Sequence, residues 1–284
     1  MQAAQQWHAC GFAPVKPVPF GAAAFDRQPR RAREMLACTT GSLLLFSILI
    51  MRSVALTSPA CPQIAVLPRA PRNGSPVPWL TSLYHRADAG PYGDRRYPGN
   101  CSGELIKDLI RYFKPQSVFD PMTGSGTCRD VCDELDILCV SKDIRFGFDA
   151  CDPKSFEGIG TFDFGWIHPP YWRMKLYSND KRDLSTAPTL SYFIHRYEKL
   201  IRNCASVLTP GGKLAILMGD YSDRETGFVP LTYWTKRLAF AAGLKQSCTD
   251  IIRFSHGASS STKVYTSSFI PGLHDTCMVF ERRV

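Results

Sequence analysis

Residues 116–129 read Gln-Ser-Val-Phe-Asp-Pro-Met-Thr-Gly-Ser-Gly-Thr-Cys-Arg, and this stretch decides the fold. Residues 117–119 form a short apolar run typical of a buried strand, Pro121 and Gly124 break it, and a helix can begin at Thr127. The pattern predicts a strand, a glycine-rich turn and a helix. Gly124 and Gly126 let a ligand lie against the backbone, and the helix start favours a carboxylate or phosphate.

The residues that follow the turn narrow the choice of ligand. A P-loop places Lys and Ser or Thr after its last glycine, but Thr127 and Cys128 stand here. A dinucleotide fingerprint requires a third glycine where this chain has Arg129. Asp143 closes a second apolar run, at the position where an acid meets ribose hydroxyls in a doubly wound sheet. The turn therefore predicts a nucleoside that carries a carboxylate.

A second motif lies at residues 162–172, Phe-Asp-Phe-Gly-Trp-Ile-His-Pro-Pro-Tyr-Trp, where an apolar strand runs directly into two prolines and two aromatic residues. Together with Asp-Pro-Met-Thr-Gly-Ser-Gly-Thr at 120–127, it resembles the S-adenosylmethionine-dependent amino-methyltransferases of DNA, which make N6-methyladenine or N4-methylcytosine. Their signature is an Asp-Pro-Phe-x-Gly-Ser-Gly-Thr turn and a later Asp/Asn/Ser-Pro-Pro-Tyr/Phe/Trp motif. The likeness covers roughly residue 97 to the C-terminus, and the ordered pair of motifs is far more specific than either alone.

The resemblance implies a fold, a cofactor and a set of binding residues. The fold is α/β: a doubly wound, mostly parallel, seven-stranded Rossmann-like methyltransferase sheet with a reversed last strand. The cofactor is S-adenosyl-L-methionine, with DNA as the partner in methylation of the restriction-modification kind. An acid after the third strand position accepts from the adenine amino group, and we choose Asp149 over Asp152 for this role. The implied cofactor-binding residues are Tyr97, Asp120, Pro121, Met122, Thr123, Gly124, Gly126, Thr127, Asp143 and Asp149.

The catalytic motif carried over from the family consists of His168, Pro169, Pro170 and Tyr171. In the family, the first side chain and the first proline carbonyl accept the two N–H bonds of the target amine, and the aromatic residue stacks on the extruded base. This chain departs from the pattern at His168. A neutral imidazole offers one acceptor nitrogen and an imidazolium offers none, so we expect the rate to fall as His168 is protonated. Retuning for another acceptor, or loss of activity, are the alternatives.

Composition distinguishes an N-terminal part without regular hydrophobic periodicity from a C-terminal part that is expected to fold. Of the net charge of +9, residues 1–99 supply +7 and residues 100–284 supply +2. We predict a poorly structured extension and linker at 1–96 and a methyltransferase domain at 97–284. The apolar stretch 43–51 is too short to span a bilayer, so we expect no membrane association. A short helix, a signal peptide and a later true start remain open for this region.

Eleven cysteines without a Cys-x-x-Cys pair indicate reduced thiols in a cytoplasmic protein. Cys128 and Cys132 lie one helical turn apart, but no further His or Cys completes a zinc site in the sequence, so we expect no metal. Cys128 is interpreted as a packing residue.

Periodicity predicts the remaining elements. We expect helices at 103–113, 127–135, 189–208 and 231–242, and strands at 137–140, 162–167, 213–218, 249–254 and 277–281.

The recognition of the target is less defined. Residues 173–188 are suited to an active-site loop, and the hydroxyl-rich loop 255–275, with Arg253, Lys263 and Tyr265, is the candidate reader of nucleic acid. Asp220 and Tyr221 are secondary candidates. A methyltransferase of structured RNA and a cofactor-binding protein without turnover are the competing functions.

Overall fold

The computed structural model describes residues 74–86, 88–254, 270 and 272–283. The expectations for the front of the chain up to residue 73, and for Lys263 and Tyr265, lie outside the described residues. The helices are α1 (Gly103–Phe113), α2 (Thr127–Glu134), α3 (Leu190–Ser206) and α4 (Leu231–Ala241). The strands are β1 (Leu83–Tyr84), β2 (Ser117–Asp120), β3 (Leu138–Ser141), β4 (Phe162–Ile167), β5 (Leu208–Met218), β6 (Tyr221–Asp223), β7 (Gly227–Val229), β8 (Leu244–Gln246), β9 (Ile251–Phe254) and β10 (His274–Arg282).

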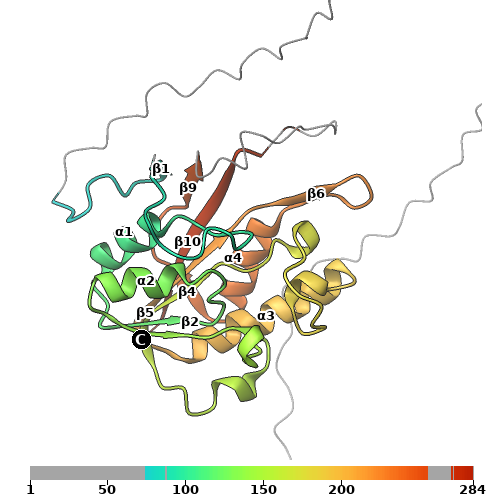
Figure 1. Ribbon diagram of the computed structural model, residues 1–284, viewed down its shortest axis with the longest axis horizontal. Coiled ribbons are helices and arrows are strands. Elements are labelled where there is room, and N and C mark those ends of the chain that lie inside the picture. Colours follow the sequence, from blue (N-terminus) through green and yellow to red (C-terminus); the bar gives the residue numbers. More distant parts are fainter. Residues whose placement is uncertain (1–73, 87, 255–269, 271, 284) are drawn as a thin grey trace, which may run out of the picture. The chain divides into compact units, whose positions relative to one another are not determined.

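One large sheet organises these elements in the order β1-β9-β10-β5-β4-β2-β3, with β8 paired to β10 (Figure 1). Strand β2 is parallel to β3 and β4, and β4 is parallel to β5. Strand β10 runs antiparallel to β5, β8 and β9. The predicted doubly wound, mostly parallel sheet with a reversed last strand is confirmed. Strands β6 and β7 form a separate antiparallel hairpin.

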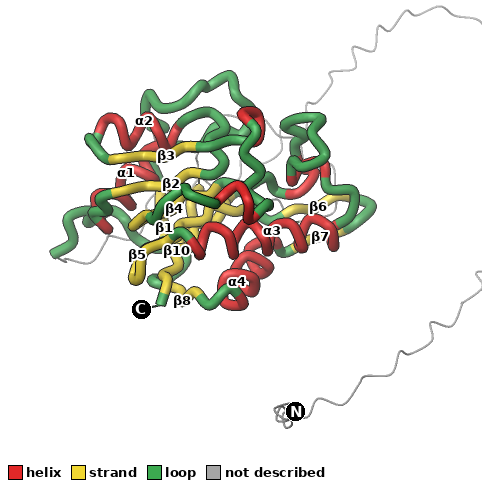
Figure 2. The backbone as a smooth tube through the Cα atoms, turned by 90° about the horizontal axis from the view of Figure 1, so that it is seen from below, coloured by secondary structure: helices red, strands yellow, loops and turns green. Residues whose placement is uncertain are grey.

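Helices cover both faces of the sheet because its strands are apolar on both faces (Figure 2). Ala215 and Leu217 of β5 pack in one cluster with α1 and α2, whereas Ile216 and Met218 pack in a second cluster with α3 and α4. Successive residues of a strand point to opposite faces, so a single buried strand serves both clusters. This arrangement holds the carboxyl ends of β2, β3 and β4 at one edge.

The chain reverses its direction of travel across the sheet next to β2. From β2 it passes through α2 to β3, and it then returns to β4 on the other side of β2. In open α/β sheets, ligands bind beyond the carboxyl ends of the strands at such a switch point. The turn after β2 and the motif after β4 flank this point, so the topology places both predicted motifs at one crevice.

The folded part begins upstream of the boundary that we placed at residue 97. Strand β1 joins the sheet edge in parallel pairing with β9. The buried Asp108 of α1 accepts hydrogen bonds from Trp79 Nε1 at 2.8 Å and from the Tyr84 hydroxyl at 2.7 Å. Arg86 forms an ion pair with the same carboxylate at 3.3 Å. The composition of this segment hides these contacts because a strand of two residues has no periodicity.

Replacing Asp108 with alanine is expected to destabilise the fold by about 3 kcal/mol, since it leaves buried donors and a guanidinium without their acceptor. The measurement is urea unfolding followed by circular dichroism. Asp133→Ala, which removes an exposed carboxylate from α2, is the matched control. Equal unfolding free energies for the two variants would show that segment 77–86 does not belong to the folded unit.

The predicted elements agree with the structure to within a few residues. The segment between β3 and β4 contains 3₁₀ helices at Ile144–Phe146 and Pro153–Phe156. Strands β1 and β8 are additional, so the described sheet has eight strands rather than the seven that we expected. Within the described ranges, no helix combines the length and apolar character that a bilayer crossing requires.

Candidate functional site

The turn after β2 is held in shape mainly by backbone hydrogen bonds. Thr123 N–H donates to the Lys142 carbonyl at 2.8 Å, and Gly126 N–H donates to the Thr123 carbonyl at 2.7 Å. Gly126 has φ +89°, a left-handed conformation that favours glycine, and it caps α2. Gly124 has φ +48°, and a Cβ atom there would lie 3.2 Å from the Tyr97 ring. Both glycines are therefore required by conformation or by close approach.

The segment before α1 closes over the turn from the other side. The Asn100 side-chain oxygen accepts hydrogen bonds from the hydroxyls of Ser125 at 3.1 Å and Thr127 at 2.7 Å. Tyr97 stacks on Tyr177 with 5.9 Å between ring centroids. Burial raises the pKa of Tyr97 to about 12, so its hydroxyl stays neutral at physiological pH. The segment of residues 97–100 thus lies beside the glycine-rich turn.

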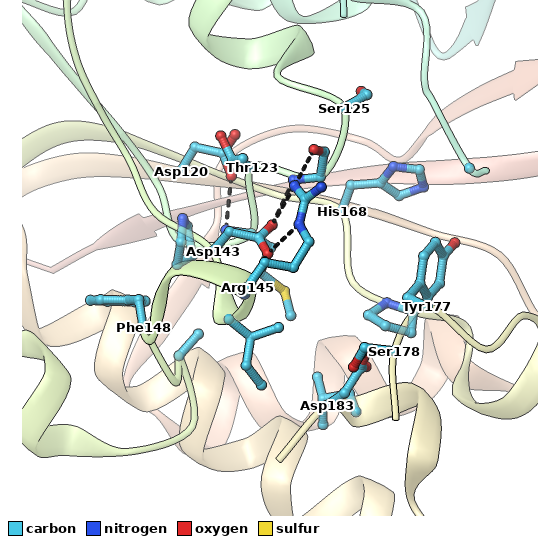
Figure 3. Close-up of a pocket in the computed structure, with 18 of the residues that line it drawn as sticks. Asp120, Thr123, Ser125, Asp143, Arg145, Phe148, His168, Tyr177, Ser178 and Asp183 are labelled. Atoms are coloured by element: carbon cyan, nitrogen blue, oxygen red, sulfur yellow. Dashed lines mark hydrogen bonds and ion pairs between the residues drawn. The ribbon is translucent and has the colours of Figure 1, made fainter. Parts of the chain in front are cut away.

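Asp143 joins the turn to the loop after β3. Its Oδ2 accepts the Gly124 N–H at 2.9 Å, and its Oδ1 accepts the Arg145 Nε–H at 2.9 Å (Figure 3). Burial acts to raise the pKa of Asp143, but the Arg145 guanidinium and the backbone N–H groups outweigh it and leave the pKa below its ordinary value. The carboxylate is therefore ionised at neutral pH and bordered by the backbone of the turn.

Asp120, at the end of β2, has a different environment. It is 2% exposed, and among the described residues its carboxyl group accepts one hydrogen bond, from Met122 N–H at 3.0 Å. Burial raises its pKa to about 8, so the folded protein holds a proton there near neutral pH. Two acids that border one turn are thus kept in different charge states.

Asp120→Asn is expected to remove a pH dependence of stability. Because the pKa of Asp120 is raised to about 8 in the folded state, the carboxyl favours folding fully below its ordinary value of 3.8 and loses this contribution as pH rises toward 8. The amide keeps the acceptor for Met122 N–H and carries no charge. Unfolding midpoints are measured for both proteins at pH 5 and pH 8. The midpoint of the variant relative to that of the wild type is expected to be higher at pH 8 than at pH 5. A constant difference at both pH values would contradict the assignment.

Asp149 lines the pocket next to Phe148 and Ala150. Its carboxylate forms an ion pair with Arg196 of α3 at 2.9 Å and accepts the Cys151 N–H at 2.9 Å. Asp152, the alternative candidate, instead accepts from Lys154 N–H at the start of a 3₁₀ helix and does not line the pocket. Of the two acids, only Asp149 lines the pocket.

His168 lies at the end of a chain of polar contacts that begins in the core. Arg253 and Asp275 form an ion pair that is almost fully buried. Asp275 Oδ2 accepts from the Tyr171 hydroxyl at 3.4 Å, and the Tyr171 oxygen lies 3.2 Å from His168 Nε2. Because the carboxylate only accepts, the Tyr171 hydrogen points to Asp275 and the Tyr171 oxygen accepts from Nε2. We therefore assign the proton of neutral His168 to Nε2, which makes Nδ1 its acceptor.

These groups border one pocket that opens to solvent. Figure 3 shows Phe148 and His168 at opposite ends of it, with Asp143 and Arg145 between them. The predicted residues that line it are Tyr97, Asp120, Pro121, Met122, Thr123, Gly124, Thr127, Asp143, Asp149, His168 and Pro170.

Three predicted residues stand behind the pocket wall, namely Gly126, Pro169 and Tyr171. The ring of Tyr171 packs on Gly219, where a Cβ atom would come within 2.6 Å of it, so this aromatic side chain supports His168.

Part of the lining comes from residues that periodicity did not single out. Tyr177, Ser178, Arg182, Asp183 and Leu184 come from the polar loop after the Pro-Pro motif. Asp183 is buried and accepts from the Ser178 hydroxyl at 2.8 Å, so this loop is fixed by its own polar groups. The polarity of 173–188 predicted a loop at the site but not which side chains face inward.

The residues that we expected to recognise nucleic acid make contacts within the fold instead. Arg253 is 3% exposed and is held by Asp275, which contradicts the expectation that it contacts phosphate. Asp220 accepts from Thr232 N–H at 2.8 Å at the start of α4, and the Tyr221 ring packs against Trp172. These side chains stabilise the fold around the pocket.

No protein-family model and no curated protein matches the sequence. Among solved structures, a protein designated a DNA modification methylase from Thermus thermophilus, complexed with S-adenosyl-L-methionine, is 18% identical with a TM-score of 0.35, over 48% of this chain and 54% of that chain. TrmN from Thermus thermophilus is 17% identical with a TM-score of 0.38, and the match covers 65% of this chain and 50% of that chain. N-methyltransferase NodS from Bradyrhizobium japonicum, in complex with S-adenosyl-L-homocysteine, is 14% identical with a TM-score of 0.33. The match covers 64% of this chain and 74% of that chain.

The matched region spans about half the length of the first two of these proteins. Similarities of this size leave the function to be argued from the pocket itself.

Proposed function

We propose that the protein is an S-adenosylmethionine-dependent methyltransferase that acts on an exocyclic amine of a base, adenine N6 or cytosine N4, in DNA. One observation carries the proposal: the turn after β2 and the His-Pro-Pro motif after β4 open on the same pocket. The turn provides backbone and carboxylate contacts of the kind that a nucleoside with a charged tail requires. The motif provides a hydrogen-bond acceptor at one end of the pocket.

The residues present fit the cofactor. Asp143 is an ionised acceptor suited to ribose hydroxyls, and it lines the pocket together with the turn. Phe148 lines the pocket next to Asp149 and provides an apolar wall for an adenine ring. Asp120 and Gly124 lie nearer β2, where the amino and carboxyl groups of a methionine tail find an acid and a glycine backbone. When bound there, the cofactor supplies an electrophilic methyl group.

The Arg145 side chain stands where the ribose would bind. Its Nε–H donates to Asp143 Oδ1 at 2.9 Å, and its guanidinium lies 5.0 Å from the centre of the Tyr97 ring. The side chain is partly exposed, so it can turn toward solvent when hydroxyl groups take over the carboxylate. We expect Arg145 to retain its contact with Tyr97 in the complex.

His168 is the residue that we assign to the amine. The lone pair of an aromatic amine is delocalised into the ring, and an acceptor that holds an N–H bond orients this lone pair toward the methyl group. With Nε2–H held by Tyr171, neutral His168 presents Nδ1 as that acceptor. His168 Nδ1 would accept the proton that the amine loses as its nitrogen takes the methyl group and the carbon–sulfur bond of the cofactor breaks to leave a thioether. The contact between Tyr171 and Asp275 keeps the imidazole in the required tautomer.

The test of the proposal is methyl transfer to defined nucleic acids. The purified protein is incubated with S-adenosylmethionine that carries a labelled methyl group and with separate pools of double-stranded DNA and tRNA. Nucleosides from each pool are then identified by mass. We expect label in DNA as N6-methyladenine or N4-methylcytosine. Label confined to RNA would overturn the substrate, and cofactor binding without label in either pool would overturn the activity.

A further inference from the structure

Three cysteines from two neighbouring elements meet behind the glycine-rich turn. Cys128 and Cys132 lie one turn apart on α2, and Cys139 lies on β3. Their three sulfur atoms all lie within 4.8 Å of one another. Cys128 and Cys132 are almost fully buried, whereas Cys139 is half-buried on the edge strand of the sheet. Sequence spacing did not reveal this group, because Cys139 is brought in by the parallel pairing of β2 with β3.

The sulfurs are arranged differently from thiols that only fill space. A buried cysteine commonly acts as a small apolar side chain, and its sulfur then faces carbon. Here each sulfur faces two others. Three convergent sulfurs form the kind of ligand set that a thiophilic metal ion requires, and the thiolate is the form that binds it.

We propose that Cys128, Cys132 and Cys139 bind one soft, thiophilic metal ion through three sulfur ligands. Metal–sulfur bonds of about 2.3 Å place three ligand sulfurs about 3.7 to 4.0 Å apart, so only a small movement of the side chains is needed. Among the described residues, this is the one group of three or more possible ligands that converge, and it contains no carboxylate. Hard cations such as Mg²⁺ and Ca²⁺ require oxygen ligands, whereas thiolates select Cu(I) or Zn(II).

The ion would cross-link α2 to β3 next to the proposed cofactor site. Cys128 lines the pocket, and α2 starts at the residue after Gly126. Strand β3 ends at Ser141, whose hydroxyl contacts that of Thr123 in the turn. An ion at the cysteines would hold the two elements that carry the turn, so its binding is expected to raise the unfolding midpoint. The proposal concerns this cluster alone and does not depend on the methyl transfer.

The test is titration of the fully reduced full-length protein with Cd²⁺, a soft probe, under anaerobic conditions. We expect a sulfur-to-metal charge-transfer absorption that saturates with one equivalent bound at this site, release of protons, and a higher unfolding midpoint. Cys139→Ser is expected to weaken binding about 100-fold and to abolish the rise in the midpoint. Cys248→Ser, which removes an exposed cysteine outside the cluster, is the control and should behave as the wild type.

A second variant guards against misfolding, since Cys139→Ala keeps an apolar side chain at the same position. If either variant of Cys139 folds and binds Cd²⁺ as tightly as the wild type, the proposal is wrong. It is also wrong if the absorption is absent from the wild type, or if mass mapping of the protein isolated with its thiols blocked finds a disulfide between two of the three cysteines. Retention of the signal by Cys248→Ser together with its loss in both Cys139 variants would support the site.

Discussion

Replacing His168 with alanine is expected to lower kcat for methyl transfer at least about 100-fold, because a positioned acceptor of this kind contributes about 10² to 10⁴ to rate. The dissociation constant for S-adenosylmethionine is expected to change by less than about threefold, since the proposal places His168 at the amine and not at the nucleoside. Single-turnover rates and equilibrium binding measured on the same preparation separate the two effects. A parallel loss of cofactor binding would show that His168 is a cofactor ligand instead.

The pH dependence of the rate distinguishes a catalytic role of His168 from a purely structural one. An imidazole ordinarily has a pKa of about 6.5, and its protonated form offers no acceptor. The wild-type rate is therefore expected to fall below neutral pH. His168→Asn retains an acceptor oxygen that does not titrate, so its rate is expected to stay flat from pH 5.5 to pH 8. A flat wild-type profile would contradict the assigned role.

Replacing Asp143 with alanine is expected to weaken S-adenosylmethionine binding about 100-fold, because the ligand loses two hydrogen bonds to a charged acceptor. The same change leaves the Gly124 N–H without its partner and loosens the turn. The measurement is isothermal titration with S-adenosylmethionine. Asp143→Asn, which keeps one acceptor oxygen but no charge, is expected to lose only about tenfold.

Asp152→Ala is the matched control for Asp143, because the Asp152 carboxylate accepts a single backbone N–H, from Lys154, among the described residues, and lies outside the pocket. We expect it to bind the cofactor as the wild type does. Equal affinities for Asp143→Ala and the wild type would place the ribose elsewhere.

The central part of the fold follows from short-range patterns. The apolar residues of α1 recur at helical spacing, and the helix runs over Gly103–Phe113 as expected. The meeting of the turn at 120–127 with His168 also follows, because β2 and β4 are parallel neighbours and end at the same edge. Here a rule of sheet topology converts two distant motifs into one pocket.

Contacts that depend on side-chain packing between distant segments did not follow. Tyr171 reads as a base-stacking residue by its place in the motif, yet it packs on Gly219 and holds His168. The sequence predicts Arg253 to be a basic residue beside a polar loop. In the structure it is buried, where it forms an ion pair with Asp275 of the neighbouring strand β10. Cys139 joins Cys128 and Cys132 only through strand pairing. Gly219 and Asp275 lie far along the chain from their partners, whereas Cys139 is close in sequence to Cys132 but lies on a different element. No local pattern identifies these contacts.

The most direct test of the account is a crystal structure of the protein with S-adenosyl-L-homocysteine. We expect the ribose hydroxyls at Asp143, the adenine beside Phe148, and the sulfur atom facing the His168 end of the pocket. A ligand bound outside this pocket, or an imidazole of His168 turned away from the sulfur into packed side chains, would contradict the assignment of methyl transfer.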